Sequence, residues 1–304
     1  MNKNGLIIQK LDGGLGNQLF QYAFCYALSR KTGKDLKVFS FYNDIMPGTR
    51  KNAIKYFKIE EACRRIPLRF YAETIECYLR AIFNFLFKTC YITNFDWNRT
   101  NDYIEYVLEN NIKVYQNINI SRCKKYYVVE GFWQSPLYFD EYREEILQLF
   151  NLKRKYQDKI NNKLIFKVIK HDPRAVSIHV RRGDYSIIGW TLTPNYYQEA
   201  IKCIKEKINN PVFYVFSDDI NWCRNYFKAF DEKFVFVEAE KNKQPYEDMY
   251  LMSQCRNNII ANSTYSWWAA YLNNFPSKIV IAPKEICNCT NKDILNANLG
   301  WYVI

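Results

Sequence analysis

Five short apolar runs in the second half of the chain limit the possible folds most strongly. The runs are AVSIHV (175–180), FYVFS (213–217), FVFV (234–237), NIIA (258–261) and KIVIA (278–282). They are rich in β-branched and aromatic residues and do not alternate with polar positions, which is typical of strands buried on both faces of a sheet. Helical patterns separate several of them. This alternation of strand and helix predicts a doubly wound α/β fold with a parallel sheet.

The helices between these runs carry recognisable start signals and apolar stripes. One is predicted to begin with Thr193 as N-cap and Pro194 at the first helical position, with an apolar stripe that continues to Ile208. EDMYLMSQC and TYSWWAAYL supply two more helices. In the last of them, Trp267 and Trp268 are adjacent and point to different helix faces, so we expect at least one in the core.

The chain opens with a strand, a glycine loop and a helix. LIIQKL reads as the strand, DGGLGNQ as the loop, and apolar residues recur at helical spacing from Leu19 to Leu28 until Gly33. The third glycine of a dinucleotide fingerprint is missing, and no GK[ST] follows as in a phosphate-binding P-loop. By itself the loop fits close strand-to-helix packing at least as well as ligand binding. A further strand, YYVVE, and a helix, EEILQLF, close the first half.

The length of 304 residues suits two lobes around a cleft. We predict one lobe over residues 1–150 and a second over residues 151–304. The Lys- and Asn-rich stretch 151–170 is the expected crossing between them.

Charge and cysteine content narrow the function classes. The net charge of +12 is spread along the chain, which suits nucleic acid, an anionic membrane surface or a phosphorylated substrate. The ten cysteines are scattered and form no CxxC, so neither a zinc site nor a disulfide framework is indicated. No secretory leader is visible, and the apolar stretch Ala81–Phe87 is far too short to span a bilayer. These features predict a cytoplasmic protein.

Polar loops follow three of the predicted strands, where ligands bind to parallel sheets. Arg181 and Arg182 follow the first strand, and their guanidinium forks are suited to a diphosphate because each fork meets two phosphate oxygens. Ser263 and Thr264 lie at a strand-to-helix junction, where free backbone N–H groups favour an anion, although an ordinary N-cap is the better reading of either residue alone.

The other residues at this edge have less specific readings. Asp218 and Asp219 follow the second strand and suit hydrogen bonding to a base or ribose, with helix capping about equally favoured. His179 is interpreted as a satisfied residue that orients the arginines rather than as a base. No D-x-D or metal-spaced His/Asp cluster occurs. A diphosphate leaving group is therefore expected to be stabilised by arginine and helix dipole without a metal ion or other cofactor.

Six ordered motifs closely resemble the bacterial α-1,2-fucosyltransferases of glycosyltransferase family 11. They are GGLGNQLFQYAF (13–24), GFWQSPLYF (131–139), HVRRGDY (179–185), FSDD (216–219), DMYLMSQC (248–255) and IIANSTYSWWAAYLNN (259–274). The resemblance runs from about Leu6 to Pro283. The chain departs from the family pattern at PKEIC after the last strand and in its short tail, which leaves the C-terminal contacts open.

The resemblance implies a two-lobed glycosyltransferase fold of the B type that holds GDP-fucose in its cleft. It implies that residues 1–150 form the acceptor-side lobe and residues 151–304 the Rossmann-like lobe that binds GDP-fucose. Motif by motif, it implies three groups of donor contacts. His179, Arg181, Arg182 and Asp184 would form the diphosphate signature, Asp218 and Asp219 would lie towards the nucleoside, and Asn262, Ser263, Thr264 and Ser266 towards the phosphates. Gly14, Gly16 and Asn17 would approach the donor from the first lobe. Arg181, Arg182, Asp184 and Asn17 are the predicted catalytic residues.

The implied reaction is an inverting transfer of fucose from GDP-fucose to the 2-hydroxyl of a terminal β-galactoside in a surface glycan such as an O-antigen. Asp184 and Asp12 are candidate bases. The basic charge is compatible with loose attachment to the inner membrane surface. The alternatives are a fucosyltransferase of another linkage and a non-catalytic binder of RNA or polyanions. No nucleic-acid motif is present, and we expect no nucleic-acid partner.

Overall fold

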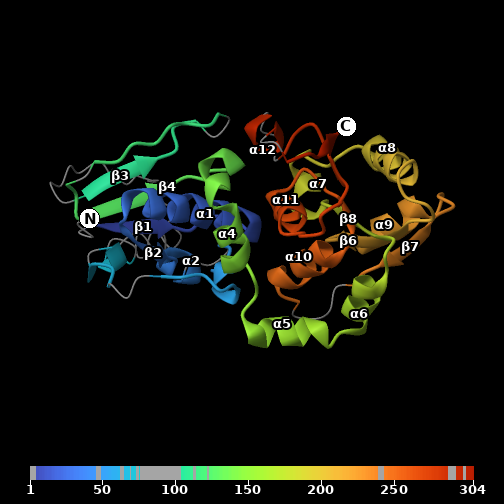
Figure 1. The fold of residues 1–304 in the computed structure, drawn as a ribbon, viewed down its shortest axis with the longest axis horizontal. Coiled ribbons are helices and arrows are strands. Elements are labelled where there is room, and N and C mark those ends of the chain that lie inside the picture. Colours follow the sequence, from blue (N-terminus) through green and yellow to red (C-terminus); the bar gives the residue numbers. More distant parts are fainter. Residues whose placement is uncertain are drawn as a thin grey trace, which may run out of the picture.

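The computed structural model describes residues 5–45, 49–61, 65–68, 70–72, 75, 104–111, 114–121, 123–238, 243–286, 292–296 and 299–304. The chain folds around two parallel sheets, one drawn in blue and green and the other in yellow to red (Figure 1). The predicted stretch Ala81–Phe87 lies outside the described residues. Within the described part, no helix is both long and apolar enough to cross a membrane.

The first sheet has four strands in the order β2-β1-β4-β3, and every pair is parallel. Its strands are β1 (Leu6–Lys10), β2 (Asp35–Phe39), β3 (Ile104–Leu108) and β4 (Tyr126–Glu130). The predicted glycine loop leads from β1 into the long helix α1 (Leu15–Thr32), which ends at Gly33 in the left-handed conformation. Short elements complete this lobe: α2 (Phe41–Ile45), η1 (Ile54–Tyr56), η2 (Pro136–Tyr138), η3 (Asp140–Tyr142) and α4 (Arg143–Leu149).

The second sheet has six strands in the order β10-β9-β8-β5-β6-β7, again with parallel pairs. The five predicted runs become β5 (Ala175–Val180), β6 (Val212–Ser217), β7 (Lys233–Phe236), β8 (Asn257–Ile259) and β9 (Val280–Ala282), and β10 (Tyr302–Val303) adds an edge. The helices of this lobe are α7 (Gly183–Ile187), α8 (Pro194–Lys205), α9 (Ile220–Phe227), α10 (Pro245–Gln254), α11 (Thr264–Tyr271) and α12 (Lys292–Asn296). Thr193 is the N-cap of α8, as predicted, although its side chain makes no capping hydrogen bond.

The predicted crossing at 151–170 is largely helical. It forms α5 (Arg154–Asn161) and most of α6 (Leu164–His171), which run along the lower edge of the molecule beneath the second lobe (Figure 1). The polar face of each helix is solvated, which explains the Lys- and Asn-rich composition. The boundary at residue 150 stays a prediction.

A buried aromatic cluster, which we call the seam, joins the two lobes. Phe20 of α1 lies 4.6 Å from the Trp267 ring and 4.9 Å from the Trp268 ring, both on α11. Phe139 stacks on Trp268 at 5.5 Å. Both tryptophans are fully buried, so the prediction of at least one core tryptophan is confirmed. The lobes therefore share one continuous apolar core.

Candidate active site

A cleft of about 940 Å³ lies between the lobes. The first lobe lines it with residues 14–17, parts of 49–56, Phe132 and Gln134. The second lobe lines it with residues that follow β5, β6 and β8 and with the start of α10. The cleft thus lies at the carboxyl ends of parallel strands, where the sequence placed the ligand site.

The glycine loop brings the lobes into direct contact. A Cβ added at Gly16 would lie 2.6 Å from Thr264 C, Thr264 Oγ1 and Tyr265 N, at the first turn of α11. Only glycine permits this approach. Gly14 has no atom within 4 Å of its Cβ position and faces the cleft. Gly16 therefore allows the two lobes to pack closely, whereas the space beside Gly14 is open.

Asn17 joins both lobes through one oxygen. Its Oδ1 accepts a hydrogen bond of 3.1 Å from Gln134 Nε2 in the first lobe and one of 2.8 Å from Thr264 Oγ1 in the second. All three residues line the cleft. These bonds fix the Asn17 side chain at the cleft floor and hold the start of α11 against α1.

Arg181 lies in the cleft, positioned by two carboxylates. Its Nη2 is 2.6 Å from Asp184 Oδ1 and its Nη1 is 2.7 Å from Asp218 Oδ2. The guanidinium also lies 5.3 Å from the ring centre of Tyr185. Three side chains therefore hold a permanently charged fork at the mouth of β5.

Arg182 points elsewhere. Its guanidinium lies 4.3 Å from the Trp222 ring centre, and its Nε is 3.2 Å from Asp219 Oδ2. Adjacent residues that leave a strand point to opposite sides, and Arg182 is not among the residues that line the cleft. The structure therefore separates the two arginines that the sequence had treated alike.

The two adjacent aspartates have internal partners. Asp219 caps α9 by accepting a hydrogen bond of 3.1 Å from Trp222 N, so the capping interpretation holds for it. Asp218 lines the cleft but accepts from Arg182 N at 2.8 Å and is ion-paired to Arg181. Each carboxylate oxygen thus has one internal contact, and only Asp218 of the two lines the cleft.

His179 is buried at the cleft wall, and its Nδ1 has no hydrogen-bond partner. The interpretation of a fully satisfied residue is therefore wrong for this atom. Burial lowers the His179 pKa to about 4; Asp218 raises it slightly and Arg181 lowers it further. The ring is thus neutral at physiological pH and offers the cleft an unmet polar atom.

The four predicted residues around α11 divide into two groups. Ser263 and Thr264 line the cleft, and Ser263 also caps the helix by accepting from Tyr265 N at 3.3 Å. Ser266 is fully buried and bonds to the backbone of Ala261, while Asn262 lines a different cavity. These positions could not be told apart from sequence, because all four lie within one loop and one helical turn.

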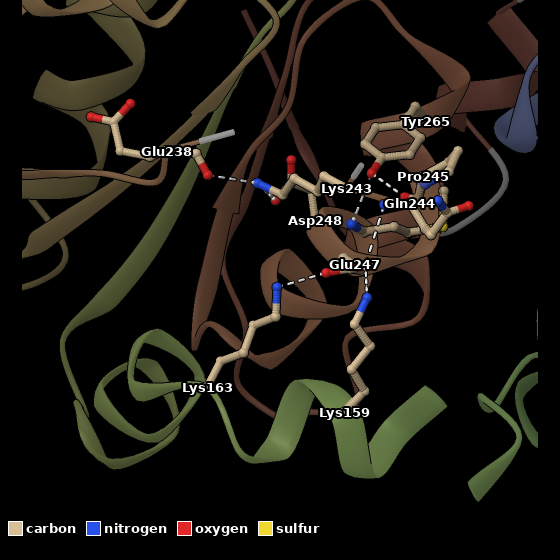
Figure 2. A network of polar contacts seen from close by, with 10 residues as sticks. Lys159, Lys163, Glu238, Lys243, Gln244, Pro245, Glu247, Asp248 and Tyr265 are labelled. Carbon is tan, nitrogen blue, oxygen red and sulfur yellow. Dashed lines mark hydrogen bonds and ion pairs between the residues drawn. The ribbon is translucent and has the colours of Figure 1, made fainter. Parts of the chain in front are cut away.

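The sequence interpretation missed Asp248, which lines the cleft from α10. Lys243 Nζ lies 2.6 Å from its Oδ1, and burial raises its pKa although Lys243 opposes the shift. Figure 2 shows this pair beside the buried Glu247. The motif DMYLMSQC contained the residue, but a carboxylate in the first turn of a helix is also an ordinary surface charge.

Glu247 ties α10 to the crossing helices. Lys159 Nζ and Lys163 Nζ lie 2.9 and 2.7 Å from its two oxygens (Figure 2). Burial alone would raise the Glu247 pKa, but hydrogen bonds from Lys163 and Lys159 outweigh burial and lower it. This buried ion cluster fixes the start of α10, and with it Asp248, relative to the crossing helices.

The two candidate bases, Asp184 and Asp12, lie in different places. Asp184 lines the cleft, whereas Asp12 lies outside its lining and accepts a hydrogen bond from Gly13 N at 2.7 Å. Among the described residues, no three His, Cys, Asp or Glu side chains are grouped so as to hold a metal ion.

The sequence profile described as Glycosyl transferase family 11 matches residues 6–301 of this chain. The chain belongs to this glycosyltransferase family. It is 33% identical over 312 residues to the O-antigen biosynthesis glycosyltransferase WbnK of Escherichia coli, covering 96% of this chain and 98% of WbnK. It is also 33% identical over 297 residues to an α-1,2-colitosyltransferase of Escherichia coli, with 91% of each chain covered.

More distant family members and solved structures agree with this placement. A galactoside 2-α-L-fucosyltransferase, SEC1 of Bos taurus, is 26% identical over 284 residues, which cover 89% of this chain and 65% of SEC1. The structure of the α-1,6-fucosyltransferase NodZ soaked with GDP-fucose superposes with a TM-score of 0.55 at 15% identity, covering 89% of this chain and 93% of NodZ. A FUT1 variant of Arabidopsis thaliana in complex with GDP superposes with a TM-score of 0.51 at 13% identity, covering 92% and 71%. The predicted two-lobed B-type glycosyltransferase fold is confirmed.

Proposed function

We propose that this family 11 glycosyltransferase transfers L-fucose from GDP-β-L-fucose to the 2-hydroxyl of a terminal β-galactoside, with inversion, in the assembly of a surface glycan. The observation that carries the proposal is Arg181, held in the cleft beside the start of α11. A guanidinium fork and the N-terminal end of a helix that line one cavity suit a diphosphate. The relatives named for O-antigen synthesis and galactoside fucosylation support the acceptor class.

The proposed reaction is a single displacement. The acceptor oxygen forms a bond to the anomeric carbon as the bond from that carbon to the diphosphate breaks, and GDP leaves with the electron pair. Arg181 stabilises the charge that gathers on the leaving diphosphate more than it stabilises the bound donor, which is the condition for a faster reaction. The acceptor proton passes to a carboxylate, for which Asp184 in the cleft lining is the proposed base.

We place the nucleobase near His179 and Asp248. His179 Nδ1 is buried without a hydrogen-bond partner, and Asp248, whose Oδ1 is ion-paired to Lys243, lines the same cleft. A carboxylate can accept hydrogen bonds from two neighbouring N–H groups of guanine.

Asp248→Asn would therefore weaken GDP binding in calorimetry at least tenfold, whereas Asp219→Asn would mainly weaken the α9 cap. Equal GDP affinity of wild type and Asp248→Asn would return the nucleoside to Asp218 or Asp219.

The donor sugar needs a direct test. The α-1,2-colitosyltransferase of Escherichia coli is as similar to this chain as WbnK is, and its name describes the transfer of colitose. Colitose is L-fucose without its 3-hydroxyl. The experiment measures GDP release from GDP-fucose and from GDP-colitose over a panel of galactosides, followed by determination of the product linkage. We expect faster turnover with GDP-fucose and an α-1,2 product. Turnover with GDP-colitose alone, or a different linkage, would overturn the proposed function.

We further propose that the crossing helices attach the protein loosely to an anionic membrane surface from the cytoplasmic side. On α6, Leu164 is 77% exposed and Val168 is 44% exposed, one turn apart. Lys167 and Lys170 lie exposed on the same short helix. The helix surface therefore combines exposed apolar side chains with positive charge. Co-sedimentation with phosphatidylglycerol vesicles that is lost in Leu164→Glu supports this; equal binding to phosphatidylcholine vesicles contradicts it.

A further inference from the structure

A second cavity, of about 410 Å³, adjoins the cleft in the second lobe. It is lined by the loop 189–193, the first turns of α8, Asn262 and the residues 283–285 that follow β9. Trp190 lines both this cavity and the cleft. The two cavities therefore share Trp190 as a wall.

Asn262 gives this cavity an unmet hydrogen-bond acceptor. The residue is only 7% exposed, and its Nδ2 donates to Trp190 O at 2.8 Å. Its Oδ1 is buried and has no partner. Buried polar atoms are nearly always paired, so an unpaired amide oxygen at a cavity wall indicates a ligand or water hydroxyl that donates to it.

Trp190 is fixed relative to the reaction centre. Its N donates to Tyr185 O at 2.9 Å and its ring packs edge-on against Tyr185 at 5.7 Å, while Tyr185 lies beside Arg181. Trp190 remains 36% exposed. A partly exposed indole offers an apolar face together with one N–H donor, which matches the C–H face and the hydroxyl rim of a sugar ring.

The rest of the lining offers hydroxyl, carboxylate and ammonium groups that can bond to sugar hydroxyls. They belong to Thr191, Thr193, Glu199, Lys284 and Glu285. A pocket with one aromatic face and several polar groups at its rim is typical of small-ligand sites, and this mixture of charges suits a neutral polyhydroxyl ligand better than a second anion.

We propose that the second cavity is a saccharide subsite of the acceptor, where the sugar next to the terminal galactose stacks on Trp190 and donates a hydroxyl hydrogen bond to Asn262 Oδ1. The subsite rests on the proposed transfer to a galactoside. In this arrangement the terminal galactose lies in the cleft between Trp190 and Arg181, with its acceptor hydroxyl towards the diphosphate. Acceptor choice then depends on the loop 189–193 as well as on the cleft, and part of the acceptor would lie on residues of the second lobe and not only on the expected acceptor-side lobe of residues 1–150.

The test fills the cavity with a large side chain. Thr193→Trp and Asn195→Trp alter exposed positions of the lining, and Thr193 makes no capping hydrogen bond that would be lost. The matched control is Lys202→Trp, an exposed position on the same helix outside the lining. KM is measured for the disaccharide N-acetyllactosamine and for methyl β-galactoside, and GDP affinity is measured by calorimetry.

We expect the KM for the disaccharide to rise at least fivefold in both filled variants, with the KM for the monosaccharide and the GDP affinity changed less than twofold. The control should match wild type in all three measurements. An unchanged disaccharide KM in folded variants, or equal effects on mono- and disaccharide, would overturn the subsite. Weaker binding of GDP-fucose with unchanged binding of GDP would assign the cavity to the donor sugar instead.

A binding measurement separates this subsite from the proposed reaction. Saturation-transfer NMR with N-acetyllactosamine reports contact between disaccharide and protein without turnover. If wild type transfers fucose to no galactoside but binds the disaccharide, and Thr193→Trp loses that contact, the subsite stands and the proposed function fails. Absence of disaccharide contact in wild type rejects the subsite.

Discussion

A methyl group at position 16 tests the contact between the lobes. In Gly16→Ala the new Cβ would lie 2.6 Å from three atoms of the α11 start, about 1 Å closer than ordinary van der Waals contact allows. Overpacking of this kind costs about 1–3 kcal/mol, and alanine recovers up to about 1 kcal/mol of helix propensity. With the full propensity gain subtracted, the net loss is at most about 2 kcal/mol, which lowers the melting temperature of a chain this long by up to roughly 3 °C.

The larger effect of Gly16→Ala falls on turnover. The clash pushes the start of α11 away from α1 and loosens the bond between Asn17 and Thr264. Since Thr264 lines the donor cleft, a displacement of about 1 Å there is expected to cost on the order of a hundredfold in rate. GDP release from GDP-fucose with a fixed galactoside acceptor measures it.

Gly14→Ala is the matched control for stability. Nothing lies within 4 Å of its Cβ position, and its backbone angles of −75° and 175° suit any residue. Its melting temperature should stay within about 1 °C of wild type, because no cavity or clash is created. Wild-type turnover and melting temperature in Gly16→Ala, or equal destabilisation in Gly14→Ala, would refute the reasoning from inter-lobe contact.

Three further outcomes are expected. Arg181→Lys should lose about 2 kcal/mol of transition-state stabilisation, roughly thirtyfold in turnover, because lysine cannot bond bidentately; Arg181→Ala should lose more, and Arg182→Ala, away from the cleft, should lose less than Arg181→Ala. Turnover should survive excess EDTA. If EDTA abolished turnover and manganese or magnesium restored it, a metal ion as well as arginine would stabilise the leaving diphosphate. In chemical denaturation, wild type should lose stability relative to His179→Asn as the pH falls from about 6.5 towards 4, since the unfolded chain binds a proton that folded His179, with a pKa of about 4, does not. A constant difference between the two proteins across that pH range would contradict the buried neutral ring.

The central strands could be predicted from sequence because burial on both faces leaves an unbroken apolar run, as in β5, β6 and β8. The strands β2 and β3 were missed because their partly exposed positions carry Lys, Asp and Glu. A short segment with such residues has the same local pattern as a loop. The two-residue strand β10 is too short to carry any pattern. β7 is also an edge strand and could be predicted from its apolar run, although the expectation that it is buried on both faces is wrong because its positions are exposed or only partly buried. The presence of charged residues at partly exposed positions therefore decided which strands were missed.

Residue types at the site were easier to predict than directions. The sequence placed Arg181 and Arg182 at the end of a strand, but which one faces the cleft depends on where Asp184, Asp218 and Trp222 lie in space. The separation of Asn262 from Ser263 has the same origin, because one side chain turns to Trp190 and the other to the cleft. Such choices are made by tertiary packing.

The aromatic seam has a consequence for engineering by recombination. Phe20 and Phe139 come from one lobe and Trp267 and Trp268 from the other, and the ring centres of these contacts between the lobes lie 4.6–5.5 Å apart. A chimera that exchanges an entire lobe with a relative replaces only half of this packed set, and the mismatched halves would leave voids or clashes worth several kcal/mol. Acceptor preferences should therefore transfer between relatives through loop grafts that leave α1 and α11 together, whereas whole-lobe exchange should yield poorly folded protein.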